Sequence, residues 1–195
     1  MPKLLREFET LKYDAGLIKE SIKQGKPVRL SGVFQRADAL NQNKRIYPKN
    51  ILEREVNNYM KLVEGNHGLG ELDHPDDSVV NLSNVSHVVR EIGWDGDNVV
   101  GTIELLTTPK GQIARQLAEC GVVFGISSRA VGETRKNSEG HDVVDESLQL
   151  VAFDLVSHPS TDGAWLNLKE ARDLSLSEAP RRYRINRLLD AILVK

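Results

Sequence analysis

The amino-acid sequence predicts an α+β fold dominated by strands, arranged as a barrel or a sandwich. About six or seven segments are rich in β-branched residues or alternate between apolar and polar residues, whereas two or three carry apolar residues at helical spacing. The predicted helices do not alternate regularly with the strands, as a parallel sheet with crossover helices would require. With 195 residues, 39% of them hydrophobic and 28% charged, the chain suits one globular domain with tails.

The first third of the chain contains two predicted helices, separated by a strand and a loop. Residues 17–24 predict a short helix that ends at a glycine, and residues 27–35 alternate as a strand does. The polar, asparagine-rich residues 36–47 predict a loop. Residues 48–63 predict a helix, because a proline suits its first turn and an apolar stripe follows. The glycines of residues 65–70 end this helix.

The rest of the predicted domain consists of a hairpin, a helix and further strands. Residues 85–92 and 99–106 are typical of strands, and the Gly- and Asp-rich residues between them favour a hairpin. A Thr-Pro pair starts a helix at residues 108–121, which ends at a glycine. Residues 122–131 predict another strand, and residues 143–156 predict one or two more.

The composition changes after residue 165. Residues 169–195 are highly charged at first, then carry four arginines behind a proline and end in an apolar run. We therefore divide the chain into an N-terminal segment with a short helix (residues 1–25), a central domain (residues 26–167) and a C-terminal tail (residues 168–195). An amphipathic helix in the tail would pack against another surface.

Composition narrows the classes of partner and compartment. The formal net charge is −2, so bulk electrostatics indicate neither a nucleic acid nor an anionic membrane as a partner. No run of about 18 apolar residues is present, so we expect no membrane-spanning helix, and the first residues lack the apolar segment of a secretory signal. A single cysteine, Cys120, cannot form an internal disulfide, which indicates a reducing compartment.

The strongest candidates for chemistry are His74 and the adjacent Ser127 and Ser128. Serine is a weak nucleophile unless a neighbouring base, most often histidine, takes its proton. The two serines lie in a predicted strand among small residues, which leave room for the backbone of a substrate. Polar groups inside an apolar strand are costly unless they are used or hydrogen-bonded. From spacing alone, a catalytic role and an ordinary structural role both stay open.

Asp154 is the candidate for a third group in such a site. It lies in the otherwise apolar stretch VAFDLV, where an acid is stable only at an edge or beside a partner. An imidazolium would be one suitable partner, and one of the many arginines would be another. The sequence leaves both partners open.

A metal site is an alternative around His74. Asp73, Asp76 and Asp77 flank this histidine and could bind a cation through their carboxylates. However, none of the five histidines belongs to an H-x-x-x-H pattern, and no C-x-x-C pair is present. A metal-dependent hydrolase is therefore a competing hypothesis, whereas an acidic surface turn without a metal or other cofactor is the expectation.

Four segments of the chain resemble those of one known family in their order. They are RLSGVFQRAD with NQNKRIYP in residues 29–48, GELDHP in residues 70–75, GISSRAVG in residues 125–132 and FDLVSHPS in residues 153–160. Together these segments resemble the prohead core proteases of T-even-like tailed phages. That family is similar in fold to the herpesvirus assemblins. The resemblance therefore implies an antiparallel β-barrel of about six or seven strands surrounded by a few helices, with an unusual serine-protease site.

The resemblance also implies a role for each candidate residue. His74 would be the general base, and one of the two serines would be the nucleophile. Related proteases often have a Ser-x-Gly pattern at the nucleophile, which Ser128 fits except at its last position. Ser128 is therefore the expected nucleophile, with Ser127 as the alternative. The third member is expected to be Asp154, with His158 as the alternative.

The family is implied to cut its substrates after a glutamate in a Leu/Ile-x-Glu context. A pocket for glutamate needs a cation, and arginine can give a carboxylate two hydrogen bonds. Arg129 is the expected substrate-binding residue, with Lys44 and Arg45 as alternatives. Two matching tripeptides in the tail end at Glu170 and Glu178, and we expect the enzyme to remove its own C-terminus after Glu178.

The expected setting is the interior of the phage prohead, in the host cytoplasm. Scaffold, core and capsid proteins would be the substrates, and the enzyme would be a homo-oligomer without a nucleic acid or membrane partner. A non-catalytic core or scaffold protein of the same assembly is the main competing hypothesis. Substitution of the serines separates the two, because a scaffold protein has no peptide cleavage to lose.

Overall fold

The computed structural model describes residues 3–11, 15–41, 43–75, 77–157 and 167–168. These residues contain eleven strands, three α-helices and one short 3-10 helix. In chain order the elements are β1 (Lys3–Leu11), α1 (Ala15–Lys23), β2 (Val28–Arg36), β3 (Arg45–Ile46), α2 (Lys49–Glu64), β4 (Leu69–Glu71), η1 (Leu82–Asn84), β5 (Val85–Asp95), β6 (Asn98–Leu105), α3 (Pro109–Glu119), β7 (Phe124–Gly132), β8 (Thr134–Lys136), β9 (Asp142–Val144), β10 (Gln149–Val156) and β11 (Asn167–Leu168).

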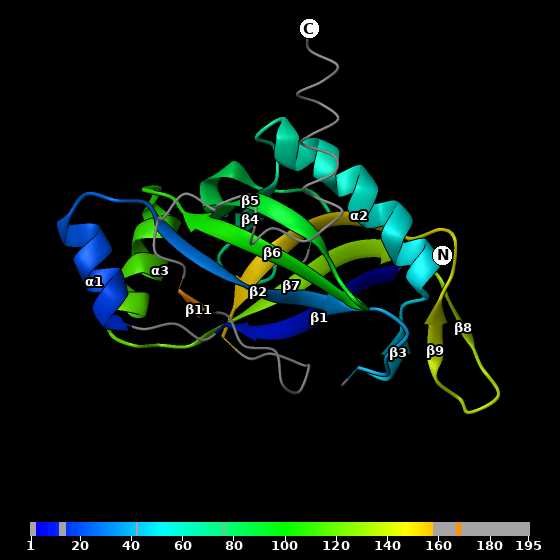
Figure 1. The fold of residues 1–195 in the computed structure, drawn as a ribbon. Helices are drawn as coiled ribbons and strands as arrows, with labels where there is room; N and C mark the ends of the chain where they lie inside the picture. The colour runs from blue at the N-terminus through cyan, green and yellow to red at the C-terminus, as the bar shows by residue number, and fades with distance from the viewer. Residues whose placement is uncertain (1–2, 12–14, 42, 76, 158–166, 169–195) are drawn as a thin grey trace, which may run out of the picture.

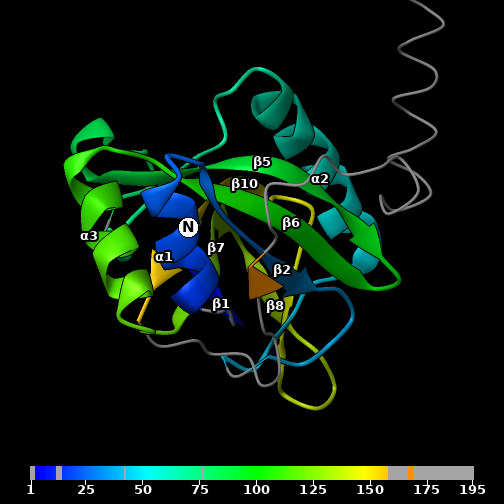
Figure 2. The same ribbon diagram turned by 60° about the vertical axis from the view of Figure 1, so that its left-hand side comes forward.

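The three helices follow the start and stop signals of the sequence. Helix α2 begins directly after Pro48, whose carbonyl accepts the N–H groups of Ile51 and Leu52 at 3.1 and 3.0 Å. In α3 the hydroxyl of Thr108 accepts the N–H of Gly111 at 3.1 Å, as a good N-cap does. All three predicted helices are confirmed, with bounds that differ by one or two residues. Figures 1 and 2 show α1 beside α3 at one end of the molecule, whereas α2 lies across the sheets.

The described strands form three sheets rather than one closed barrel. The sheet orders are β1-β7-β10, β11-β2-β6-β5-β4 and β3-β9-β8, and among these pairs only β3 with β9 is parallel. The first two sheets meet where Leu72, after β4, forms a single parallel bridge with Leu155 of β10. The pairing stops there because the next residue, Asp73, has a φ of 69° and turns the chain away. The expected dominance of strands is confirmed, and barrel closure is not found in this pairing.

Strand β1 was not predicted from the sequence. It pairs with β7 over its whole length, from Lys3 opposite Gly132 to Leu11 opposite Phe124. Its stretch KLLREFETL mixes charged and apolar residues, so its local pattern is weak, and the long-range pairing with β7 defines it as a strand. The short strands β3, β4, β8 and β11 were also missed, whereas the strands expected in residues 143–156 are present as β9 and β10.

Aromatic packing connects strand β10 of the first sheet with strand β2 of the second sheet and with helix α2. The ring of Phe153 lies 5.0 Å from the ring of Phe34 on β2 and 5.2 Å from the ring of Tyr59 on α2, measured between centroids. All three side chains are buried in the core. The next residue along β10 is Asp154, so this packing holds the backbone of a candidate site residue in place.

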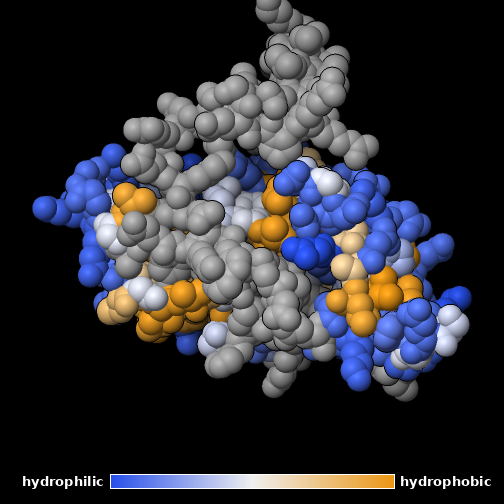
Figure 3. Space-filling view, turned by 60° about the horizontal axis from the view of Figure 1, so that its bottom comes forward, coloured by the Kyte–Doolittle hydropathy of each residue, from blue (hydrophilic) through white to orange (hydrophobic). Residues whose placement is uncertain are grey.

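On the face that Figure 3 shows, the described residues form a largely hydrophilic surface with separate apolar patches. Exposed large apolar residues gather on α1, on α3 and just after α3: Leu17, Ile113, Leu117, Val122 and Val123. No helix within the described residues is long and apolar enough to cross a membrane.

Candidate active site

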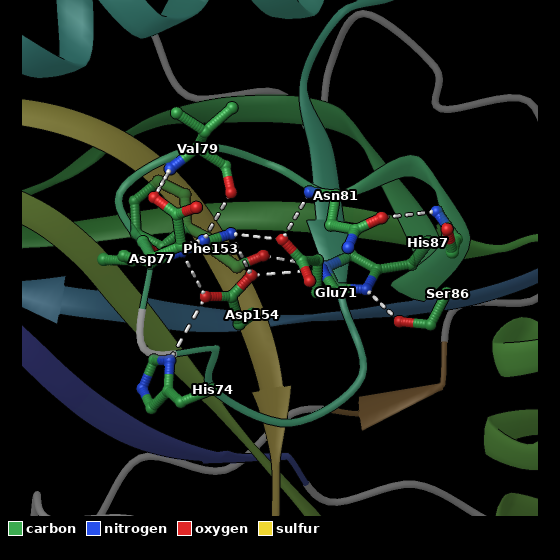
Figure 4. A network of polar contacts seen from close by, with 11 residues as sticks. Glu71, His74, Asp77, Val79, Asn81, Ser86, His87, Phe153 and Asp154 are labelled. Carbon is green, nitrogen blue, oxygen red and sulfur yellow. Dashed lines mark hydrogen bonds and ion pairs between the residues drawn. The ribbon is translucent and has the colours of Figure 1, made fainter.

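His74 lies between Asp154 and Ser127 in a line of polar contacts. Its Nε2 atom is 2.5 Å from Ser127 Oγ, and its Nδ1 atom is 3.2 Å from Asp154 Oδ2. Because Asp154 is the acceptor on one side, the Nδ1–H group donates to it, and Nε2 is left to accept the hydroxyl proton of Ser127. Figure 4 shows the ring of His74 directed at the carboxylate of Asp154. The order of groups is that of a serine, a base and an orienting acid.

The pairing of β7 with β10 explains why Ser127 takes this place. Asp154 is directly opposite Ser127, and successive side chains of a strand point to opposite faces. Ser128 therefore points to the face of β7 that carries Ile126. Both serines are buried, but the hydroxyl of Ser128 has no hydrogen-bond partner among the described residues. The expected preference for Ser128 has no support in this geometry, which brings Ser127 to His74.

His74 reaches this line from the segment that follows β4. The N–H of Asp73 donates to the carbonyl of Leu155 at 2.7 Å, which ties the segment to β10. The left-handed conformation of Asp73 then turns the chain so that His74 faces Asp154. Pro75 follows directly and restricts the backbone of His74. Strand β4 itself lies so close to the core that a Cβ atom on Gly70 would overlap His87 Nε2 and the carbonyl oxygen of Phe153.

Arg129 lies on the same face of β7 as Ser127 and is completely buried. Its Nε atom is 2.9 Å from Asp154 Oδ2, and its Nη2 atom is 3.2 Å from Asp154 Oδ1. Nη2 also lies 2.9 Å from Glu71 Oε1, in an ion pair whose side chains are 0% and 1% exposed. The expected role of Arg129 was to bind a substrate glutamate. The structure instead places its guanidinium against two carboxylates of the protein.

Glu71 is a residue of this site that the sequence analysis missed. Its N–H donates to Asp154 Oδ1 at 3.0 Å, and its Oε1 atom accepts the N–H of Asn81 at 2.9 Å besides contacting Arg129. A signal was available, because an arginine inside the apolar stretch VVFGISSRAV predicts a buried acidic partner. The sequence does not say which of the 28 acidic residues that partner is.

His87 is a second buried histidine near the candidate site. Its Nε2–H donates to the carbonyl of Phe153 at 2.9 Å, and its Nδ1 accepts the hydroxyl of Ser86 at 2.8 Å (Figure 4). Burial lowers the pKa of His87 to about 4, against the opposing effects of the Asp154 charge and of the bond to Phe153. His87 is therefore neutral near pH 7 and joins β5 to β10 without adding charge.

The other candidates from the sequence lie elsewhere. Lys44 and Arg45 lie at β3, in the sheet with β8 and β9, whereas the polar line is carried by β7, β10 and the segment after β4. His158, Glu170 and Glu178 lie outside the described residues.

The metal alternative has no ligand cluster in the described part of the chain. No group of three or more His, Cys, Asp or Glu side chains is arranged there to hold a metal ion. Both ring nitrogens of His74 already have partners, and Asp73 and Asp77 are exposed. Asp76 lies outside the described residues.

Comparisons with known proteins agree on one family. A sequence model of the family described as "Prohead core protein serine protease" matches residues 14–175. The prohead core protein protease of Enterobacteria phage T4 is 33% identical over 154 residues, which cover 77% of this chain and 73% of that protein. The solved structure of the bacteriophage T4 capsid assembly protease, gp21, aligns with a TM-score of 0.69 and 26% identity, over 81% of this chain and 99% of that one. The matched residues of the family include the whole polar line around His74.

Proposed function

The chain belongs to the family of prohead core protein serine proteases, and from this premise we propose that Ser127 is its nucleophile, His74 its general base and Asp154 the residue that orients His74. As a member of the family the chain is a protease of phage prohead maturation. Its substrates are phage capsid and scaffold proteins, and its place of action is the interior of the prohead.

The single observation that supports this assignment is the 2.5 Å contact between Ser127 Oγ and His74 Nε2. In the proposed reaction the hydroxyl proton moves to Nε2 as Oγ attacks the carbonyl carbon of the scissile peptide. His74 then gives this proton to the leaving amine, which leaves an acyl group on Ser127. A water molecule, deprotonated by the same histidine, then attacks the acyl carbon; the bond to Ser127 Oγ breaks, the acyl group leaves as a carboxylic acid, and His74 returns the proton to Oγ. No cofactor enters these steps.

The proposed cleavage sites are peptide bonds after a glutamate in a Leu/Ile-x-Glu context. The same specificity would let the enzyme trim its own tail after Glu178. The cation that selects glutamate is not Arg129 in this proposal, because its guanidinium already contacts Glu71 and Asp154. Lys44 and Arg45 stay candidates for that role. Assembly into a homo-oligomer and closure of the strands into a barrel stay predictions.

The test is cleavage of a Leu-x-Glu-Ala peptide by the full chain and by two separate variants, followed by mass spectrometry. We expect Ser127→Ala to lower kcat/KM by about a thousandfold or more, because the nucleophile is lost. Ser128→Ala is the matched control on the adjacent residue, and it should keep kcat/KM within about threefold. A chelator should leave the parent rate unchanged.

The reverse pattern, an inactive Ser128→Ala and an active Ser127→Ala, would contradict the assignment of the nucleophile. Equal activity of the parent and both variants would contradict serine catalysis altogether. A parent that cleaves neither the peptide nor scaffold protein would instead agree with the non-catalytic alternative.

A further inference from the structure

Four ionisable side chains form one cluster beneath the proposed nucleophile: Glu71, His74, Arg129 and Asp154. The side chains of Glu71, Arg129 and Asp154 are at most 1% exposed, and that of His74 is 8% exposed. They come from the end of β4, the segment after it, β7 and β10. Charges this deep are stable only when they are paired and hydrogen-bonded, so each member constrains the others.

Arg129 lies against both carboxylate oxygens of Asp154, through a hydrogen bond from Nη2 and an ion-pair contact of Nε that makes no hydrogen bond among the described residues. Nε faces Oδ2 at 2.9 Å and Nη2 faces Oδ1 at 3.2 Å, while the N–H of Glu71 donates to Oδ1 at 3.0 Å. The planar fork of a guanidinium fixes the orientation of a carboxylate in a way that one point charge cannot. The carboxylate is thereby held with Oδ2 toward Nδ1 of His74.

The positive charge of Arg129 cancels the negative charge of Asp154, and the negative charge of Glu71 compensates for this loss. Arg129 and Asp154 alone would carry no net charge, and Asp154 would then stabilise an imidazolium poorly. With Glu71 the cluster has a net charge of −1 while His74 is neutral, and zero when His74 holds the proton of Ser127. The net charge of the cluster is therefore zero at the stage of the reaction when His74 is protonated. At that stage the negative charge of Glu71 and Asp154, already in place, stabilises the imidazolium.

We propose that Glu71 and Arg129 are positioning residues of the protease: Arg129 holds Asp154 against His74, and Glu71 keeps the cluster negative so that His74 can take the proton of Ser127. This proposal rests on the function proposed above. Neither residue touches the reacting atoms, and both act through Asp154 and His74.

Arg129 and Glu71 also form hydrogen bonds with the backbone between residues 77 and 81. Arg129 Nη1 donates to the carbonyl oxygens of Asp77 and Val79 at 2.9 and 3.2 Å. Glu71 Oε1 accepts the N–H of Asn81 at 2.9 Å. Residues 77–81, which lead to η1, are therefore anchored at three backbone groups by the two side chains that surround Asp154, as Figure 4 shows for the labelled residues.

Among the side chains that the structure describes, other ionisable groups near Asp154 do not supply this charge. Burial lowers the pKa of His87 to about 4, and burial together with the Asp154 charge raises the pKa of Tyr59 far above its usual value. Both are therefore neutral near pH 7. Asp73 and Asp77 are exposed, so water screens their charges.

Glu71→Gln isolates the charge of Glu71 from its hydrogen bonds. The amide oxygen can keep both bonds that Oε1 accepts, and the amide nitrogen replaces Oε2, which has no hydrogen-bond partner among the described residues. We expect kcat to fall about tenfold with KM within about twofold. We also expect the acid limb of the pH profile of kcat/KM to move to lower pH, by on the order of half a pH unit, because a negative charge near the imidazolium is lost.

A double variant tests the charge count. Glu71→Gln together with Arg129→Met removes one charge of each sign, so the net charge returns to −1. The acid limb should return to its parent position, whereas kcat should stay low because no guanidinium holds Asp154, whose carboxylate then keeps only His74 and the backbone N–H at position 71 as partners. Glu104→Gln is the matched control: this carboxylate also pairs with two arginines, Arg29 and Arg90, but it lies on β6 outside the cluster. It should change neither kcat nor the acid limb.

The outcomes separate this inference from the proposed function. If Ser127→Ala is inactive while folded Glu71→Gln keeps the parent kcat and acid limb, the positioning role is wrong and the nucleophile assignment stands. If Glu71→Gln loses activity only through a smaller folded fraction, seen by circular dichroism with an unmoved acid limb, Glu71 is merely structural and the inference is also wrong. Should Glu71→Gln not fold, the double variant decides, because a parent-like kcat in it would overturn the role of Arg129.

Discussion

At the scale of single residues, the direction of a side chain distinguishes two serines that are neighbours in the sequence. Ser127 and Ser128 are adjacent, equally buried and equally capable of nucleophilic chemistry. The register of β7 against β10 puts Ser127 opposite Asp154 and turns Ser128 toward the other face. The Ser-x-Gly pattern favours Ser128, but a short sequence motif does not show which residue of the neighbouring strand lies opposite each serine.

Asp154 shows a second limit of local reasoning. The sequence left its partner open between a histidine and an arginine, and the structure gives it both. A carboxylate has two oxygens and several acceptor positions, so it can serve both partners at once.

His87 provides a prediction about stability. Its pKa in the folded protein is about 4, below the value of 6.5 for a free histidine. The unfolded chain therefore binds a proton at a pH where the folded protein does not, and stability falls as pH drops from about 6.5 to about 4. The loss should approach about 3 kcal/mol across this window and should be absent above it.

Denaturant unfolding at a series of pH values measures this loss, with Ser127→Ala as the background to prevent self-cleavage. In that background His87→Gln should flatten the pH dependence between about 4 and 6.5, although it lowers stability at pH 7. His67→Gln is the matched control, because His67 is exposed and its ring meets water in both states. Parallel curves for His87→Gln and the background would contradict the prediction.

At the scale of elements, the three-residue strand β4 decides how the site is assembled. It pairs with β5 on one side and ends in the bridge to β10 on the other. Gly70 makes this possible, because any side chain there would collide with His87 and the backbone of Phe153. From the sequence, residues 65–70 predict only a break after a helix. Strand β4 has three residues, which are too few to show a period.

Gly70→Ala should therefore be strongly destabilising. The overlap involves the backbone of β10 as well as a ring, so β4 must move, and we expect a loss of roughly 2–4 kcal/mol together with most of the activity. Gly93→Ala in β5 is the control, since a Cβ atom there meets nothing within 4 Å. Denaturant unfolding and peptide cleavage of both variants provide the measurement. A Gly70→Ala protein as stable and active as Gly93→Ala would show that β4 is free to shift.

At the scale of the whole molecule, the polar cluster depends on parts of the chain that lie far apart in sequence. His74 and Asp154 are 80 residues apart, and Glu71 and Arg129 are 58 apart. The N-terminal strand β1, predicted to belong to a separate segment, pairs with β7 opposite both serines. We therefore expect the N-terminal segment to stabilise β7, the strand that carries the proposed nucleophile.

The C-terminal tail allows self-cleavage to be tested directly. If the enzyme cuts after glutamate, purified active protein should lose residues 179–195 by cleavage after Glu178, as intact-mass spectrometry would reveal. Ser127→Ala should keep the whole tail, and Glu178→Gln should block this cut in an otherwise active enzyme. Release of the same fragment from Ser127→Ala, or an intact tail in active enzyme, would contradict self-trimming.

The sequence by itself determined the dominance of strands, the three helices and the residues His74, Asp154 and the serine pair as the candidate chemistry. The strands and helices follow from local periods and caps, and the candidate residues from polar groups where burial makes them costly, together with the resemblance of four segments to one family. Only the tertiary structure decided that Ser127 faces His74, that Arg129 is committed to Asp154 and Glu71, and that β1 and β4 are strands. The physical reason is that register and ion pairing join residues distant in sequence, and the free energy of a buried contact depends on which groups meet there.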